Sequence, residues 1–326
     1  MNHRTNTIPP EVEYHRVLAG EKRRIGRGVL AIVLLIGGLL IFSIALTAAA
    51  TALDDAIGTD GGPAYSPLIH AAGLASVAFL IPWSMLIQRW LYGVRGPSLH
   101  SVISRFRFDI FGRALVLILP AWIILLGVLY LAPVPEGTPW PNTDVLWFIL
   151  ATLLLTPLQA AGEEYGYRGL VFRVAGGWAR GARAGLVVGV LVSSVVFAAI
   201  HVSTDVWLNV HYLVFAVGTA LITWRTGGLE VAVVLHAGIN TLTFVLEAAL
   251  QQDFSVLADR SAGVGEAAAT LGPAVVIVLT TVVVWMVTRR TGPARTPNNT
   301  DRPGHSEDRT RAASGASRGG AWDEGR

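Results

Sequence analysis

Two adjacent carboxylates interrupt an apolar stretch of the chain. Glu163 and Glu164 follow the almost wholly hydrophobic stretch 145–161, within the sequence Gly-Glu-Glu-Tyr-Gly-Tyr-Arg-Gly (162–169). A helix that spans a bilayer needs about 20 residues, so this stretch is long enough to cross most of a membrane. An ionised carboxylate deep in such a helix costs about 2.5–3.5 kcal/mol. The pair therefore indicates either a charged cap where a helix leaves the membrane or a site built for chemistry.

The spacing of the residues that follow predicts different partners for the two carboxylates. Arg168 follows Glu164 by four residues, which is the spacing and the order that favour an ion pair on a helix. Glu163 projects about 100° away from Glu164 on a helix of 3.6 residues per turn, toward the face that carries Tyr167. The spacing predicts that Arg168 neutralises Glu164 and that Glu163 stays free for chemistry.

Further polar side chains lie in two later apolar segments. His201 closes one of them, and His236 and Asn240 lie four residues apart, on one helix face, in the other. Thr243 and Glu247 extend that face. Taken singly, each group would suit a hydrogen bond between packed helices, worth about 0.6 kcal/mol. Taken together with the carboxylates they predict a shared site, because polar groups on separate spans must face one another or a water-filled cavity.

A carboxylate, two imidazoles and an amide are suited to hydrolysis of an amide bond. A carboxylate and an imidazole can hold and deprotonate a water, directly or through a metal ion. An imidazole and an Asn amide can donate to an oxyanion. The histidines also suit zinc, although the sequence lacks the His-Glu-x-x-His motif of common zinc proteases. The absence of cysteine excludes disulfides, thiolate metal sites and cysteine nucleophiles.

The composition predicts an all-α, polytopic membrane protein. Of the 326 residues, 52% are hydrophobic and only 14% are charged, whereas soluble domains carry about 25% charged residues. The net charge of +3 does not indicate a nucleic-acid partner, because the basic residues lie in the connections beside the spans. We expect an uncleaved first span and about eight transmembrane helices, with kinks at Pro82, Pro120 and Pro157. The expected spans are 29–50, 66–87, 111–131, 145–166, 184–202, 207–224, 229–250 and 271–288.

The basic residues of the connections predict the orientation of the spans. Lys and Arg occur in the N-terminal segment, in the second and fourth connections and after the sixth and eighth spans, but not in the first and third connections. Arg260 is the exception. By the positive-inside rule, both termini are expected to be cytoplasmic. The amino-acid composition of the chain suggests a bacterial source, so the expected location is a bacterial cell membrane.

The predicted spans divide the chain into five parts. We expect a cytoplasmic basic tail (1–28), three spans (29–144), a catalytic core of four spans (145–250), an external loop with the eighth span (251–290), and a disordered cytoplasmic tail (291–326). Residues 169–178 are expected to continue the fourth helix or to lie along the membrane interface. Asp205, Asn209 and His211 lie near the fifth connection, as an external turn or as groups that approach the site.

Three motifs in this order resemble those of a known family, the CAAX-protease and bacteriocin-processing (CPBP, or Abi) intramembrane proteases. The motifs are Glu163-Glu164-x-x-x-Arg168, Phe197-x-x-x-His201 and His236-x-x-x-Asn240. The stretch Thr-Gly-Gly-Leu at 226–229 is also similar to the family. The resemblance covers residues 145–250, and each motif alone is weak, whereas the ordered set on apolar segments is specific.

The resemblance implies a helical membrane fold with a conical cavity open to the cytosol. It implies that Glu163 and His201 activate the water. It implies further that His236 and Asn240 stabilise the oxyanion, or that His236 joins His201 and Glu163 as ligands of a zinc ion. Metal-dependent and metal-independent mechanisms both stay open.

The same resemblance implies that Glu164 and Arg168 support the site, and it leads to a test of depth. At about 1.5 Å per residue, His201 lies about 25 Å from the start of its span near Ala184, whereas His236 lies about 10 Å from Leu229. The two histidines meet only if the fifth helix starts outside the bilayer, as we expect, or tilts.

The expected function is that of an intramembrane peptidase acting on a peptide or membrane-protein substrate at the cytoplasmic face. Eukaryotic members of the family remove the last three residues after a prenylated cysteine. Bacteria generally lack this modification, so peptide maturation, self-immunity and membrane-protein turnover are the candidate pathways. The alternatives are a non-catalytic scaffold or bacteriocin-immunity protein of the same fold and a transporter. A transporter would favour broken helices in matched halves, and the first three spans show no counterpart to the glycines at 162–169.

Overall fold

The computed structural model describes residues 8–57, 65–131, 137, 139–252, 260–261, 263 and 267–298. Eight helical spans in this part of the chain are long and apolar enough to cross a membrane, which confirms the predicted all-α fold and the number of spans. The long helices are α1 (Ile25–Ile57), α2 (Pro67–Ala78), α3 (Leu80–Tyr92), α4 (Phe108–Leu129), α5 (Asn142–Glu163), α7 (Ala182–Ala199), α8 (Val206–Thr226), α9 (Glu230–Ala249) and α11 (Ala267–Thr288). Shorter elements are η1 (Tyr14–Arg16), η2 (Gly96–Leu99), η3 (Glu164–Val171) and α6 (Phe172–Gly176).

Two spans differ from simple helices. The second is divided at Phe79 into α2 and α3, three residues before Pro82, because proline has no N–H to donate and its ring crowds the preceding turn. The fourth does not end at Gly166 as expected. It continues through η3, a π-helix, and α6 to Gly176 without a break. Residues 169–176 thus continue the fourth helix, which is one of the two arrangements expected for 169–178, and 164–176 are buried.

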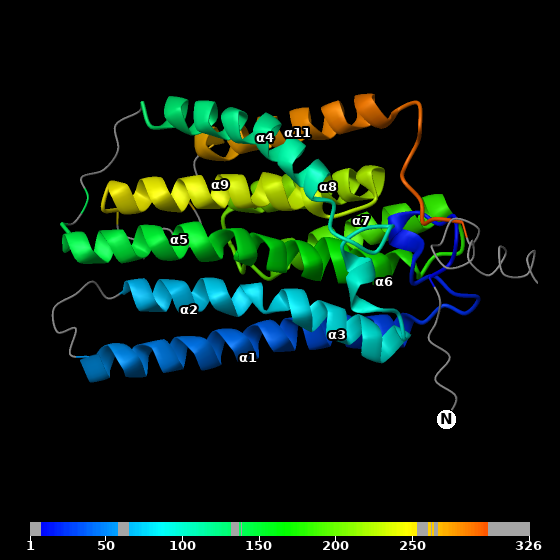
Figure 1. Cartoon of the computed structure of the whole chain (residues 1–326), viewed down its shortest axis with the longest axis horizontal. Helices are drawn as coiled ribbons and strands as arrows, with labels where there is room; N and C mark the ends of the chain where they lie inside the picture. Colours follow the sequence, from blue (N-terminus) through cyan, green and yellow to red (C-terminus); the bar gives the residue numbers. More distant parts are fainter. Residues whose placement is uncertain are drawn as a thin grey trace, which may run out of the picture.

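The continuous unit α5–η3–α6 runs through the centre of the bundle. Figure 1 shows α5 between α2 and α9, with α1 outside α2 and with α4 and α11 beyond α9, in agreement with the helix contacts. Helix α8 packs against α7 and α11. Side chains of η3 and α6 therefore meet protein on every side, whereas the apolar outer faces of α1 and α11 are exposed.

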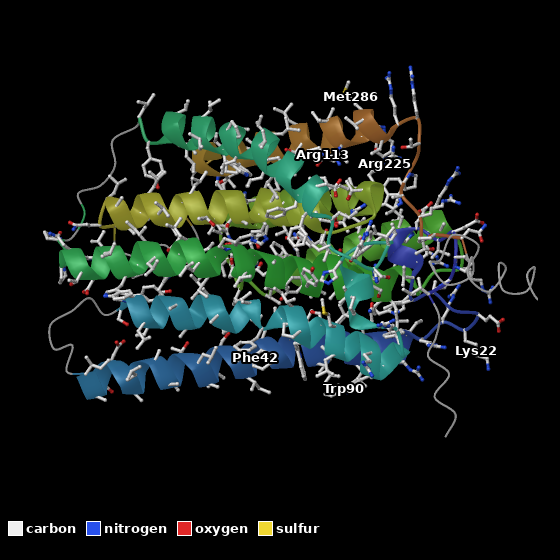
Figure 2. All side chains as sticks on the ribbon, in the orientation of Figure 1. Lys22, Phe42, Trp90, Arg113, Arg225 and Met286 are labelled. Carbon is white, nitrogen blue, oxygen red and sulfur yellow. The ribbon has the colours of Figure 1, made fainter. Side chains whose placement is uncertain are left out.

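The two ends of the described chain meet at one end of the bundle. Glu11 N–H donates to the Thr296 carbonyl at 3.0 Å, and Thr296 N–H donates to the Val12 carbonyl at 2.9 Å. We expected disorder from residue 291 onward, and this is wrong for 291–298, because Thr296 is buried and main-chain bonds hold the segment in place. Figure 2 shows Lys22 and Arg225 at this same end.

Several predicted features lie outside the described residues. These are residues 1–7 of the basic N-terminal tail, most of the external loop before α11, and residues 299–326 of the C-terminal tail. That both chain ends lie on the cytoplasmic side of a membrane stays our prediction.

The approach of Phe197 in α7 to His236 in α9 bears on the depth of the two histidines. The ring centroids of Phe197 and His236 lie 6.3 Å apart. Phe197 is about 22 Å along α7 from Ala182, and His236 is about 9 Å along α9 from Glu230. Helix α7 therefore begins beyond the first residue of α9 or crosses it at an angle, which is the condition under which the two motifs can meet.

Candidate active site

The two carboxylates lie at the junction of α5 and the π-helix η3. Glu163 is the last residue of α5 and Glu164 is the first residue of η3, and both are buried. Gly162 packs on α2 so closely that a Cβ atom would collide with the Val77 carbonyl oxygen. π-Helical turns are rare and occur frequently at functional sites. The close approach to α2 and the wide turn together place two adjacent carboxylates inside the protein.

Glu164 forms a buried network with Arg168 of its own motif and with His236 of the third motif. Its Oε1 atom lies 2.8 Å from His236 Nδ1, and its Oε2 atom lies 3.3 Å from Arg168 Nε. The ion pair that the four-residue spacing predicts is therefore present. An ionised carboxylate only accepts hydrogen bonds, so His236 donates from Nδ1.

The guanidinium of Arg168 is enclosed by α7 and α8. Its Nε atom donates to Thr219 Oγ1 at 2.8 Å. Its Cζ atom lies 4.0 Å from the ring centroid of Phe197 and 5.2 Å from that of Phe215. The Phe of the second motif thus stacks on the Arg of the first, and three separate spans hold Glu164 in one position.

Glu163 is held differently, by one oxygen only. Its Oε1 atom accepts a hydrogen bond from Gln159 Nε2 at 2.6 Å. Its Oε2 atom is buried, has no hydrogen-bond partner among the described residues, and lies 4.0 Å from His236 Nε2. One carboxylate oxygen thus stays available beside an imidazole nitrogen that makes no hydrogen bond to the residues that the structure describes.

Asn240 joins the same group through a residue that the sequence analysis missed. Asn240 Nδ2 donates to Gln159 Oε1 at 3.3 Å. Gln159 precedes Glu163 by four residues and is buried. A polar amide one turn before the carboxylate, in an otherwise apolar stretch, was the signal that could have identified it.

His201 lies in the turn after α7, stacked on Tyr212 with ring centroids 4.0 Å apart. Its Nδ1 atom lies 2.7 Å from the Phe197 carbonyl oxygen, and because a carbonyl only accepts, Nδ1 carries a proton. Burial lowers the pKa of His201 below the usual 6.5, and the nearby charge of Glu163 opposes this effect. The neutral ring at pH 7 therefore offers Nε2 as an acceptor.

Of the three polar residues near the fifth connection, Asp205 and Asn209 form the turn, whereas His211 does not. Asp205 Oδ1 accepts from Leu208 N–H at 2.9 Å, as the N-cap of α8. Asn209 Nδ2 donates to the Ser203 carbonyl at 2.9 Å. These two residues build the turn, as expected of an external connection. His211, in contrast, lies near enough to His201 and His236 to interact electrostatically with both.

The donor set does not fit a zinc site as it stands. Among the described residues, no group of three or more His, Cys, Asp or Glu side chains could hold a metal ion, so Glu163, His201 and His236 do not form one together. His236 Nδ1 and Glu163 Oε1 are already bonded to protein groups. We therefore derive no reaction step through a metal.

A comparison of the sequence with models of protein families also points to this part of the chain. Residues 142–242 match the model described as Type II CAAX prenyl endopeptidase Rce1-like. The matched segment contains all three motifs and Gln159.

A bacterial relative matches part of the chain. The chain is 30% identical over 97 residues to the Bacillus subtilis (strain 168) protein YyaK, itself described as uncharacterized. The aligned part covers 29% of this chain and 32% of YyaK, so the chain spans about a third of the relative it matches. No solved structure matches the chain.

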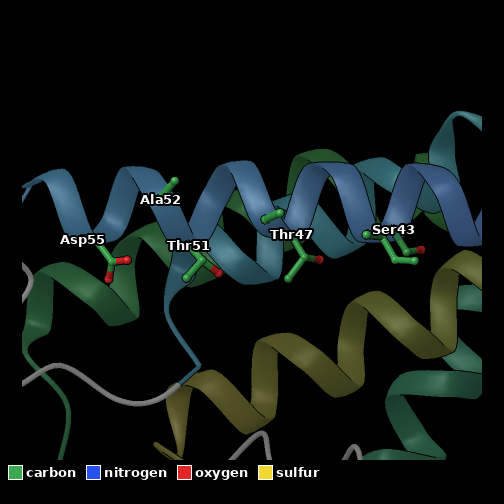
Figure 3. Close-up of a pocket in the computed structure, with 7 residues that line it drawn as sticks. Ser43, Thr47, Thr51, Ala52 and Asp55 are labelled. Carbon is green, nitrogen blue, oxygen red and sulfur yellow. The ribbon is translucent and has the colours of Figure 1, made fainter.

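A groove on the first span is lined by residues outside the segment 142–242 that matches the family model. It has a volume of about 680 Å³ and is lined by residues of α1. Figure 3 shows Ser43, Thr47, Thr51 and Asp55 along one side of the helix, each four residues after the last. The residues of the three motifs do not line this groove.

Proposed function

We propose that the chain is an intramembrane peptidase in which Glu163 and His201 activate a water molecule without a metal ion. The observation that carries the proposal is the buried Glu163 carboxylate, with Oε1 fixed by Gln159 and Oε2 left without a partner. The match of residues 142–242 to a CAAX endopeptidase family model and eight apolar spans support a protease of the membrane.

The proposed reaction begins with a water that donates to two acceptors, Glu163 Oε2 and His201 Nε2. Glu163 removes a proton as the water oxygen attacks the carbonyl carbon of the scissile peptide bond. The carbonyl oxygen becomes an oxyanion. The protonated Glu163 then returns its proton to the leaving nitrogen, which releases an amine and a carboxylate.

His236 and Asn240 are proposed to stabilise the oxyanion. Since Glu164 requires His236 to donate from Nδ1, Nε2 can donate to the substrate only when the ring carries both protons. Glu163 Oε2 and Glu164 Oε1 lie 4.0 and 2.8 Å from the Nε2 and Nδ1 atoms of this ring. Asn240 uses one amide hydrogen for Gln159 and keeps the other for the substrate.

The substrate class is proposed from the same site. A cytoplasmic entrance, inferred from the basic residues at the end of the bundle shown in Figure 2, suits a peptide or the end of a membrane protein. A non-catalytic scaffold or immunity protein of the same fold and a transporter are the rival functions, and neither requires Glu163 to react.

The test is cleavage of a fluorogenic peptide library by the full chain, purified in detergent. Wild type is compared with Glu163→Ala and His201→Ala, each with a chelator and with zinc restored. We expect both substitutions to lower cleavage by about 10²–10⁴-fold, the usual contribution of general acid–base groups, and the chelator to have no effect on wild type.

Three results would contradict the proposal. Cleavage that survives in both variants would assign the activity to a contaminating protease. Loss with the chelator and recovery with zinc would favour the metal mechanism. A wild-type chain that cleaves neither the library nor membrane-embedded peptides would favour the scaffold function.

A further inference from the structure

Gln159 bridges the two proposed halves of the reaction. Its Nε2 atom donates to Glu163 Oε1 at 2.6 Å, and its Oε1 atom accepts from Asn240 Nδ2 at 3.3 Å. One amide therefore connects the group that would remove the proton of the water with the group that would stabilise the oxyanion. The bridge joins α5 to α9, which pack along each other.

The two neighbours fix the direction of the Gln159 amide. An ionised Glu163 only accepts hydrogen bonds and the Asn240 nitrogen only donates, so a rotated Gln159 amide would place oxygen against oxygen and nitrogen against nitrogen. A buried amide that lost both bonds would leave several polar atoms unsatisfied, at about 1–3 kcal/mol each. The side chain is buried, so water does not readily replace either partner.

This arrangement decides which oxygen of Glu163 is free. The bond from Gln159 occupies Oε1, so the unpartnered Oε2 atom is the one that lies 4.0 Å from His236 Nε2. The same amide also fixes the orientation of Asn240, whose second amide hydrogen is left for a substrate oxygen.

We propose that Gln159 is a positioning residue of the peptidase, which orients Glu163 and Asn240 together. The proposal rests on the proposed function. It assigns Gln159 no contact with substrate, so its effect should fall on kcat and on the pH profile rather than on KM.

The test uses the full chain in detergent and a peptide from the library that wild type cleaves. The variants are Gln159→Leu, which removes both bonds, and Gln159→Glu, which keeps the shape but places a second acid against Glu163. Thr156→Val is the matched control, because Thr156 lies one turn earlier on α5, is fully buried, and has no hydrogen-bond partner for its hydroxyl among the described residues.

We expect Gln159→Leu to lower kcat by at least about tenfold with little change in KM, as loss of an orienting partner does. Gln159→Glu should move the acid limb of the pH profile to higher pH, because two adjacent carboxyl groups share one proton until the pH is raised. Thr156→Val should keep the wild-type kcat and pH profile.

The outcomes separate this proposal from the proposed function. If Glu163→Ala is inactive while Gln159→Leu and Gln159→Glu both keep the wild-type kcat and pH profile, Gln159 has no positioning role and the peptidase site stands. If Glu163→Ala is active, the site itself is wrong. If Gln159→Leu does not fold, the pH profile of Gln159→Glu decides. An equal loss of activity in Thr156→Val would overturn the inference, since any change on this face of α5 would then suffice.

Discussion

Two polar clusters lie inside this apolar bundle, and both contain a fully buried arginine from the continuous unit α5–η3–α6. The site cluster consists of Gln159, Glu163, Glu164, Arg168, His236 and Asn240. The cap cluster consists of Tyr14, Gln88, Ser98 and Arg173, at the end of the bundle where the chain termini meet. The arginines are five residues apart in sequence, yet their partners differ in kind.

The cap cluster uses neutral partners from connecting segments. Arg173 Nη2 donates to the Ser98 carbonyl at 2.7 Å, and its Cζ atom lies 3.8 Å from the ring centroid of Tyr14. Tyr14 in turn donates to the Leu99 carbonyl at 2.5 Å. No ion pair with Arg173 occurs among the described residues, so the cluster fastens the N-terminal segment to η2 without a carboxylate.

The site cluster instead contains two carboxylates with different surroundings. One oxygen of each, Glu163 Oε2 and Glu164 Oε2, has no hydrogen-bond partner in the described part of the chain, as is also true of Arg173 Nε in the cap cluster. Glu164 Oε2 nevertheless has Arg168 Nε at 3.3 Å, whereas no arginine or lysine pairs with Glu163 among the described residues. The comparison teaches that a buried carboxylate without an arginine beside it, more than burial of charge, distinguishes a group available for chemistry from one that holds the fold.

The largest effect on stability is expected within the site cluster itself. Glu164→Gln would leave the fully buried Arg168 without its counter-charge, which costs about 3–5 kcal/mol. Glu163→Gln is the matched control, since it makes the same chemical change one residue earlier. It should alter the free energy of unfolding by less than about 1 kcal/mol, because Glu163 Oε2 has no hydrogen-bond partner to lose.

Unfolding of both variants in detergent, followed by circular dichroism, measures the difference. We expect Glu164→Gln to be strongly destabilised, and Glu163→Gln to be stable but inactive. Equal destabilisation of the two variants would show that both carboxylates are structural, and the distinction between them would be lost.

A smaller effect is expected in the cap cluster. Arg173→Met would leave the Ser98 carbonyl and Gln88 without a donor, at about 1–3 kcal/mol of unfolding free energy. Activity per folded molecule should stay within about threefold of wild type, since no side-chain hydrogen bond or ion pair joins Arg173 to the site cluster among the described residues. Arg180→Met is the control, because the Arg180 side chain is exposed and surface changes stay within about 0.5 kcal/mol.

Peptide cleavage normalised to the folded fraction checks this prediction. A loss of activity in Arg173→Met comparable to that of Glu163→Gln would join the two clusters into one functional unit.

The contrast between the clusters also explains how far the sequence could predict them. Apolar blocks of bilayer length predicted eight spans, and the four-residue spacing predicted the pair of Glu164 and Arg168. These features depend on local periodicity, which one sequence displays. The expected zinc ligands Glu163, His201 and His236 are each near the site but do not form a three-ligand group, because shared position in a fold does not fix distances of a few ångströms.

Other features depend on contacts between distant segments. The bond from Asn240 to Gln159 joins residues 81 positions apart, and the bond from Val12 N–H to Thr296 Oγ1 joins residues 284 positions apart. The spacing of residues within a helix cannot predict pairs that are so far apart in the sequence. The π-helix also depends on its surroundings. The close approach of this helix to α2 requires a glycine at position 162, and no local propensity predicts a wide turn. The tail expected to be disordered from residue 291 is ordered through 298 for the same reason.

The smallest effect on stability is expected from a change of pH, through His15, which lies beside the cap cluster. His15 is buried, its Nε2 atom lies 3.0 Å from the Ala182 carbonyl oxygen, and its ring stacks on Phe172. Burial lowers the pKa of His15 below 6.5, and the nearby Glu13 only partly opposes this. The unfolded chain therefore takes up a proton near pH 6.5 while the folded chain does not. The stabilisation is complete above pH 6.5 and is lost as the pH falls toward the folded-state pKa.

His15→Gln isolates this contribution, because a Gln amide can still donate to the Ala182 carbonyl but does not titrate. The other titrating groups are common to both proteins, so the informative quantity is the difference between their melting temperatures at pH 7.5 and at pH 5. We expect wild type to lose more stability than His15→Gln over this range, while the activity per folded molecule of the two proteins stays equal at pH 7.5. Parallel melting curves at all pH values would show that His15 takes up its proton in the folded cap as readily as in the unfolded chain, and the cap would then be more open to water than its packing on Phe172 and α7 implies.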